Sequence, residues 1–245
     1  ELAIMLAERA SASMQPPFDQ FQLRSEDEWR EFRIAAWLHD CGKITTPEHI
    51  VDKGSKLEAI YNRLHEVRMR FEVLWRDAEI NYLRGVAREP EQAQLLEEER
   101  DRQQAELLQE FHFVAECNIG GETLSDAARD RLRRIASRTW IRHFSKRVGL
   151  SPLETQRLPE TPEALPATES LLADRPEHKI AHPRDGQLPA GYGIRMTVPE
   201  WQQDLGELHN LFVSRGTLTD EDRFRIQAHM ISTVKMLESL PFPEE

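Results

Sequence analysis

Cysteine and glycine are scarce in this sequence, and long hydrophobic runs are missing. The 245 residues include 2 cysteines and 11 glycines. Cys41 and Cys117 cannot build the several disulfides of a small secreted domain, so we expect reduced thiols and a cytoplasmic protein. No stretch of 18 apolar residues is present, so the sequence offers no candidate membrane span. Gly-rich phosphate loops, Ser nucleophile elbows and Cys-x-x-Cys zinc pairs are also missing, which excludes those classes of site.

Acidic residues outnumber basic ones. The chain has 43 Asp and Glu against 32 Lys and Arg, which gives a formal net charge of −11. This balance argues against a broad surface for nucleic-acid polymers or for an anionic membrane. A small anionic phosphoester remains compatible with it, because bound metals and a nearby lysine set the field inside a site regardless of net charge.

The pentapeptide at residues 39–43, within IAAWLHDCGKITTPEHI, has the residue types of a metal site. His39 and Asp40 offer one imidazole nitrogen and one carboxylate, and a carboxylate can bridge two metals. Lys43 follows His39 by four positions and Asp40 by three. If the helix suggested by residues 34–38 continues, all three side chains lie on one face. A cation there is well placed to hold a phosphate oxygen.

A second segment, RGTLTDEDRFRIQAHMISTVKMLESLPFP, spans residues 215–243. Thr219, followed by acidic residues at 220–222, predicts a helix start, and His229 lies within that helix. Each residue also has a structural interpretation. His39 fits a helix histidine, His229 a histidine that faces solvent, and Cys41 a small packing residue rather than a ligand.

Both segments resemble signatures of the HD superfamily of metal-dependent phosphohydrolases, and specifically of its HD-GYP branch. LHDCGKITTPEHI is similar to the first signature, L-H-D-x-G-K-I-x-x-P-x-x-I. Segment 215–243 is similar to the region that follows it in that branch, where a turn leads to Leu-Thr, an acidic pair and a helix with one metal-binding His. Together the two segments cover 42 of the 245 residues.

The resemblance implies an enzyme that hydrolyses a cyclic dinucleotide, with cyclic di-GMP as the expected substrate and a metal-activated water as nucleophile. His39, Asp40 and His229 would bind two divalent metals, with Asp40 bridging. Fe or Mn is expected first, with Zn or Ni as alternatives. Asp40 and Lys43 would be the catalytic residues, and Lys43 and Arg215 would bind substrate.

The chain also departs from the family pattern. No His precedes His39, and neither a His-His pair nor a Gly-Tyr-Pro motif follows His229. The tripeptide 191–193, Gly-Tyr-Gly, precedes His229 and lacks the proline. We therefore interpret the chain as a piece cut inside the catalytic domain at both ends. Two alternatives stay open: a phosphohydrolase for another nucleotide, and a non-catalytic signalling or dimerisation module with the same fold.

The two motifs lie 190 positions apart, whereas in the family only a short turn separates them. An insertion of roughly 150 residues therefore interrupts the catalytic domain. We expect a first part over residues 1–54, an insertion over 55–212 and a second part over 213–245. The entry at 51–54 and the exit at 213–216 share a V-x-K/R-G pattern.

The insertion predicts a helical hairpin over about 56–118. Its first helix has an apolar heptad stripe that ends before the Glu89-Pro90 step: Leu57, Ile60, Leu64, Val67, Phe71, Leu74 and Ala78. A second, highly charged helix follows over about 91–117. The hairpin is interpreted as a dimer contact between two copies or as a lever from a sensor; the alternative is a hairpin that packs on its own catalytic domain.

The rest of the insertion predicts one helix and one irregular segment. Ser125 is the expected N-cap of a helix over about 125–147 that includes Trp140. Eight of the 14 prolines lie between Pro152 and Pro199, which predicts an irregular segment over about 149–200. The fold class is therefore all-α: an HD-domain helical bundle interrupted by the inserted hairpin and the Pro-rich segment.

Three other histidines compete with His229 as metal ligands. His65 lies 26 positions after His39, near the usual distance for the family's next ligand, but it lacks the Leu-Thr-acidic lead-in of His229. His178 and His182 are four positions apart, a spacing that binds metals on a helix. The surrounding prolines argue against a helix there, so His229 is preferred.

Overall fold

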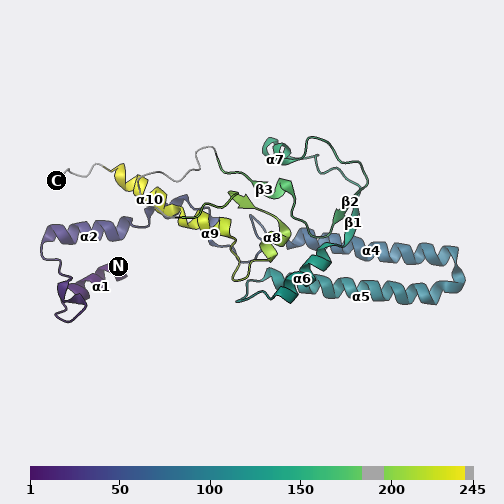
Figure 1. Cartoon of the computed structure of the whole chain (residues 1–245), viewed down its shortest axis with the longest axis horizontal. Helices are drawn as coiled ribbons and strands as arrows, with labels where there is room; N and C mark the ends of the chain where they lie inside the picture. The colour runs from purple at the N-terminus through teal and green to yellow at the C-terminus, as the bar shows by residue number, and fades with distance from the viewer. Residues whose placement is uncertain (184–195, 241–245) are drawn as a thin grey trace. The chain divides into compact units, whose positions relative to one another are not determined.

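The computed structural model describes residues 1–183 and 196–240, and the chain divides into two compact units (Figure 1). The first unit combines Glu1–Pro47 with Arg225–Glu245, and the second is Glu48–Phe224. The sequence places its domain boundaries after 54 and 212, which is 7 and 12 positions from these limits, and those boundaries remain a prediction. The tripeptide 191–193 lies outside the described residues.

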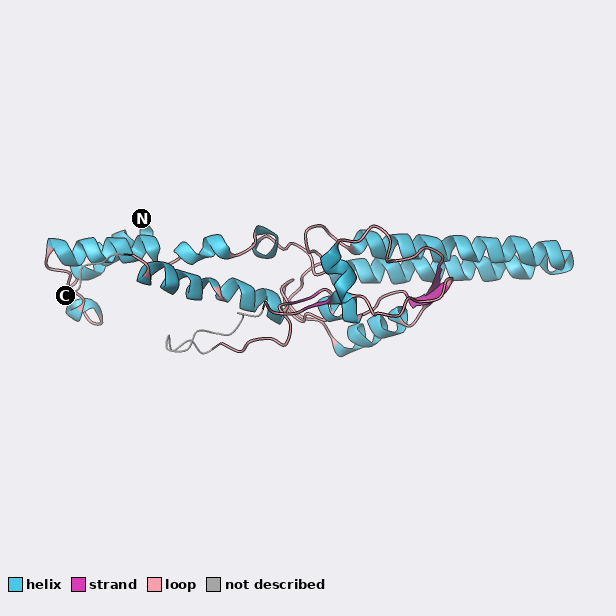
Figure 2. Ribbon diagram, turned by 90° about the horizontal axis from the view of Figure 1, so that it is seen from above, coloured by secondary structure: helices cyan, strands magenta, loops and turns pink. Residues whose placement is uncertain are grey.

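Helices dominate the described residues (Figure 2). Strands among them form two small antiparallel sheets of two strands each. The prediction of a mostly helical fold is confirmed. None of the helices in the described ranges is long and apolar enough to cross a membrane.

The first unit contains α1 (Leu2–Ser11), α2 (Glu26–Leu38), the 3-10 helix η2 (Cys41–Thr45) and α10 (His229–Glu238). Ser25 starts α2 with a capping box: its Oγ accepts from the Glu28 amide at 3.1 Å, and Glu28 Oε2 accepts from the Ser25 amide at 2.8 Å. Helix α9 (Asp220–Gln227) leads from the second unit into the first.

Two segments far apart in sequence meet where η2 packs against α10. The Gly42 amide donates to Thr233 Oγ1 at 3.0 Å. A Cβ at position 42 would overlap the backbone of His229 and Thr233. Only glycine therefore permits this close approach, which explains why the His-Asp motif continues with Gly42.

The second unit is built on the predicted hairpin, which is confirmed. Helices α4 (Leu64–Arg88) and α5 (Ala93–Asn118) run side by side in both views, joined by the 3-10 helix η3 (Pro90–Gln92) (Figures 1 and 2). The apolar stripe of α4 packs into the core with Leu107 and Val114 of α5, and the rings of Phe71 and Phe111 meet edge to face at 5.4 Å.

The hairpin starts later than the sequence predicts. Leu57 and Ile60 belong to the predicted stripe but precede α4, and Ile60 is 87% exposed. Asn62 Oδ1 accepts from the Leu64 amide at 3.1 Å and forms an Asx-type turn just before the helix. Leu57 is buried, and its amide donates to Asn118 Oδ1 at 2.7 Å, so it packs from a turn.

The helix predicted over about 125–147 is also shorter. Ser125 caps α6 (Asp126–Ala136) as predicted, with its Oγ accepting from the Ala128 amide at 3.2 Å. The helix ends where the Ser137 hydroxyl donates to the Arg134 carbonyl at 2.7 Å. Trp140 lies instead in strand β1 (Thr139–Arg142), which pairs with β2 (Ala167–Ser170). The backbone of this segment thus hydrogen-bonds across a sheet, which the apolar pattern did not reveal.

The Pro-rich segment contains only short elements among its described residues. Its elements are α7 (Pro152–Arg157), the 3-10 helix η4 (Pro176–His178) and strand β3 (Lys179–Ile180). Strand β3 pairs with β4 (Gln203–Asp204), and α8 (Glu207–Leu211) follows. Helix α3 (Glu48–Val51) opens the second unit.

A buried ion pair fixes the start of α9 in the second unit. Lys53 Nζ lies 2.7 Å from Asp222 Oδ2, with both side chains 4% exposed, and 3.1 Å from Asn210 Oδ1. Thr219 Oγ1 accepts from the Asp222 amide at 3.2 Å, which confirms the predicted helix start. Breaking such a pair on one side leaves an uncompensated buried charge, so it strongly constrains this turn.

Candidate metal centre

Asp40 lies between α2 and η2, where the helical path changes. The sequence predicts His39, Asp40 and Lys43 on one face of a continuing α-helix, but α2 ends at Leu38 and a 3-10 helix begins at Cys41. The expected continuation of the α-helix is therefore wrong: the backbone changes to the tighter 3-10 helix η2, which packs against α10. Lys43 still reaches Asp40, since side chains three apart nearly eclipse in a 3-10 helix.

The Asp40 carboxylate is the centre of the candidate site. Oδ2 lies 2.6 Å from Lys43 Nζ and 2.9 Å from His39 Nε2. Oδ1 lies 3.6 Å from Nε2 of His229. The Lys43 hydrogen bond, together with charge on His39, Lys43 and His229, holds the pKa of Asp40 below its ordinary value. Asp40 therefore stays ionised at neutral pH, as a metal ligand must.

Both histidines direct the same ring atom at Asp40. His39 Nδ1 lies 2.9 Å from the Ala36 carbonyl, and His229 Nδ1 contacts the Ile226 carbonyl. A carbonyl only accepts, so each Nδ1 must carry a hydrogen. In the neutral imidazole, Nε2 then bears the lone pair and points it toward the carboxylate. That arrangement calls for a positive charge between them, either a proton on each ring or a cation.

The donor types fit a divalent transition metal. Two Nε2 atoms and a carboxylate are the mixed nitrogen and oxygen ligands that suit Fe, Mn, Zn or Ni, and the backbone bonds at Nδ1 are the outer contacts that orient metal-binding histidines. Their convergence is incomplete: within residues 1–183 and 196–240, no group of three His, Cys, Asp or Glu side chains is gathered closely enough to hold an ion. His39 is 63% exposed and His229 is 15% exposed.

Arg215, the predicted second substrate ligand, lies in the second unit. It is exposed on the turn between α8 and α9, and its carbonyl accepts from Arg223 Nη2 at 3.2 Å. Its role in substrate binding remains a prediction.

The competing side chains have other partners. His65 is exposed on α4, with Nδ1 2.7 Å from Arg68 Nη1. His178 Nδ1 accepts from the Arg175 amide, and His182 Nε2 meets the Pro199 carbonyl. Cys41 is half-buried as a free thiol.

Sequence reasoning missed the residues that bring the two motifs together. Thr233 Oγ1 accepts a hydrogen bond from the Gly42 amide, and Ser232 Oγ lies 3.1 Å from Thr45 Oγ1. The signal was present in part: Thr233 follows His229 by four positions, so it shares a helix face with the predicted ligand.

Comparison with protein-family models found an HD domain at residues 166–245. The match includes His229 and excludes residues 39–43, and it begins inside the predicted insertion. It supports the HD superfamily, whose members are generally metal-dependent hydrolases. No curated protein and no solved structure matched the chain.

Proposed function

We propose that the chain carries part of the catalytic site of a metal-dependent phosphodiesterase of the HD-GYP type, with a cyclic dinucleotide, first of all cyclic di-GMP, as substrate. The observation that carries the proposal is the contact of Asp40 with His39, Lys43 and His229. These side chains come from two segments 190 positions apart, and they are the residues in which each segment resembles the family.

The site residues divide into ligands and a phosphate contact. His39, Asp40 and His229 would hold the metal, which supplies Lewis acidity and lowers the pKa of water. Lys43 now pairs with Asp40 Oδ2, and its side chain is 61% exposed. A lysine is a compact point charge on a flexible stem, so Lys43 can exchange this carboxylate for a phosphate oxygen of a bound substrate.

Hydrolysis of cyclic di-GMP by the protein loaded with Mn or Fe tests this function. Asp40→Asn keeps the shape of the side chain and removes its charge, and we expect activity to fall by about 100-fold or more. Asp27→Asn, at an exposed position in the first turn of α2, is the matched control and should retain activity. Equal activity in the two variants would refute the assignment of Asp40.

The alternative of another nucleotide substrate uses the same site. Cyclic di-AMP, a linear dinucleotide and a simple phosphomonoester, assayed beside cyclic di-GMP, distinguish the cases. The non-catalytic alternative is favoured by one observation, the incomplete convergence of ligands within the described residues. It predicts no turnover of any of these substrates by the metal-loaded protein.

A further inference from the structure

A cleft of about 370 Å³ lies in the second unit, where the α6–β1 connection meets the hairpin. Its volume falls in the range of small-molecule sites. Three elements line it: Leu74, Asp77, Ala78 and Asn81 of α4, Gln103 and Leu107 of α5, and Ser137, Arg138 and Thr139 after α6. Nothing in the proposed phosphodiesterase chemistry uses these residues.

Asp77 and Asn81 give the cleft an unpaired polar wall. They lie one turn apart on α4, so both side chains present to the same side of the helix. Across residues 1–183 and 196–240, neither side chain has a hydrogen-bond or ion-pair partner. An ionised carboxylate without a cation beside it attracts one from solution.

The other polar groups of the cleft mostly offer acceptors. Gln103 Nε2 already donates to Glu99 Oε1 at 2.5 Å, which leaves the amide oxygen of Gln103 available. The Ser137 hydroxyl donates to the Arg134 carbonyl and keeps its lone pairs. These groups suit a ligand that donates hydrogen bonds.

Arg138 does not make the cleft cationic. Its Nε lies 2.6 Å from Glu110 Oε2, and its Nη2 lies 3.1 Å from Glu106 Oε2. Arg138 is thus paired with two carboxylates, and one of them, Glu106, also pairs with Arg102 at 2.7 Å. Among the charged residues that line the cleft, Arg138 is therefore already paired and Asp77 is not, which favours a cationic ligand over an anionic one.

The floor of the cleft is apolar. Ala78 and Leu107 are each 5% exposed, and Leu74 packs against the core beside them. A short hydrocarbon body would cover this floor while a charged head meets Asp77, so the cleft combines an apolar base with a few polar groups.

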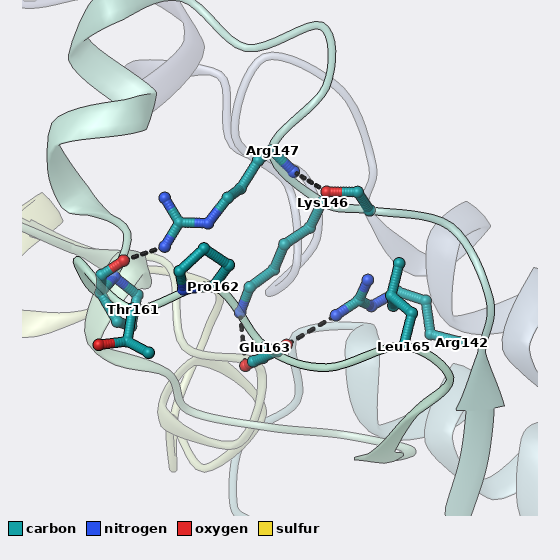
Figure 3. A pocket seen from close by; sticks show the side chains of 9 residues that line it. Arg142, Lys146, Arg147, Thr161, Pro162, Glu163 and Leu165 are labelled. Atoms are coloured by element: carbon teal, nitrogen blue, oxygen red, sulfur yellow. Dashed lines mark hydrogen bonds and ion pairs between the residues drawn. The ribbon is translucent and has the colours of Figure 1, made fainter.

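A second pocket in the same unit, lined by basic side chains, differs from this cleft because its charged groups are already paired (Figure 3). Arg142 Nη2 and Lys146 Nζ lie 2.7 and 3.2 Å from the Glu163 carboxylate, and Arg147 donates to the Pro159 carbonyl. Each cation there already has a partner, so that pocket offers no comparable unpaired charge.

We propose that the cleft binds a small organic cation, with an ammonium head on Asp77 and Asn81 and a short apolar body over Leu74, Ala78 and Leu107. The ammonium group donates hydrogen bonds to the Asp77 carboxylate and to the amide oxygen of Asn81. The apolar body removes part of the floor from water, which adds to affinity.

Calorimetric titration of the full chain with n-butylammonium, at about 0.15 M salt to screen weak surface attraction, tests the site. We expect millimolar binding, about tenfold weaker binding by Asp77→Asn, and no change in Glu91→Gln. Glu91 is exposed on the turn between the hairpin helices and loses the same charge outside the cleft. Asn81→Lys places a tethered ammonium beside Asp77 and should also weaken binding.

Two neutral or anionic analogues complete the test. 1-Butanol and butyrate share the hydrocarbon body, and both should bind more weakly than n-butylammonium. Three results would overturn the proposal: no binding of n-butylammonium, binding of 1-butanol as tight as that of the cation, or equal binding by Asp77→Asn and Glu91→Gln.

Discussion

At the scale of single residues, the Asp40 carboxylate joins the candidate site, because His39, Lys43 and His229 all lie within 4 Å of its oxygens. The His39, Asp40 and Lys43 cluster follows from short spacing within one motif, and the structure brings these side chains together on one carboxylate. The end of α2 at Leu38 could not be predicted from the sequence, because it depends on the contact between Gly42 and Thr233, which are 191 positions apart. Contacts that distant leave no periodic signal in the chain.

Gly42→Ala should destabilise the first unit by about 1–3 kcal/mol, because the added methyl group overlaps backbone atoms that cannot rotate away. Thermal unfolding followed by circular dichroism measures the loss. Gly121→Ala is the matched control, since a Cβ there meets nothing within 4 Å. Equal stability of the two variants would show that η2 and α10 are not packed this closely.

His209 and Glu221 predict a pH dependence of stability in the second unit. Their side chains lie 3.1 Å apart, and Glu221 is 8% exposed. Burial raises the pKa of Glu221, but hydrogen bonds from His209 and Thr219 outweigh it and lower the pKa to about 2. The Glu221 hydrogen bond, against the opposing effect of burial, raises the pKa of His209 above its ordinary value of 6.5.

The signs of the two shifts define a window. Because the pKa of Glu221 is lower in the folded protein, ionised Glu221 stabilises the fold above pH 4.5, and this stability is lost as the pH falls toward 2. A raised His pKa stabilises below 6.5, and that part is lost as pH rises through the folded pKa of His209. Between pH 4.5 and pH 6.5, denaturant unfolding should therefore show Glu221→Gln roughly 2 kcal/mol less stable than wild type. At pH 3 the difference in the free energy of unfolding should be smaller. The exposed Glu122→Gln is the control, and a difference that does not change with pH would contradict the ion pair.

At the scale of elements, periodicity predicted the hairpin and side-chain chemistry decided its limits. The heptad stripe identified α4, but it began too early, at Leu57 and Ile60, because hydrophobic spacing does not reveal the turn at Asn62. Ser125 marked the start of α6 correctly. Its end and strand β1 were missed, since pairing with β2 comes from a segment 28 positions further along the chain.

The hairpin also predicts self-association. Met69, Ile80 and Leu83 of α4 are 62%, 40% and 57% exposed, and their spacing places them on one helix face. We expect a dimer by sedimentation, and a monomer for the double variant Ile80→Glu, Leu83→Glu, because buried like charges oppose association. Leu153→Glu, at a 73% exposed position in α7, is the control. A monomeric wild-type protein would favour the alternative in which the hairpin serves its own chain.

At the scale of the whole molecule, His39, Asp40, Lys43 and His229 belong to one compact unit although a long segment separates them in sequence. The second unit carries the hairpin and the cleft proposed for an organic cation. The acidic balance of the chain does not oppose a phosphoester substrate, since the three cationic or metal-binding side chains around Asp40 set the local field.

The metal content of the purified protein tests the central claim most directly. Elemental analysis of the wild-type chain should find about one or two equivalents of iron or manganese, and Asp40→Ala should lose them. Asp27→Asn should retain the metal, which separates loss of a ligand from a general loss of charge. Metal in the wild-type chain no higher than in Asp40→Ala would contradict the assignment of His39, Asp40 and His229 as ligands.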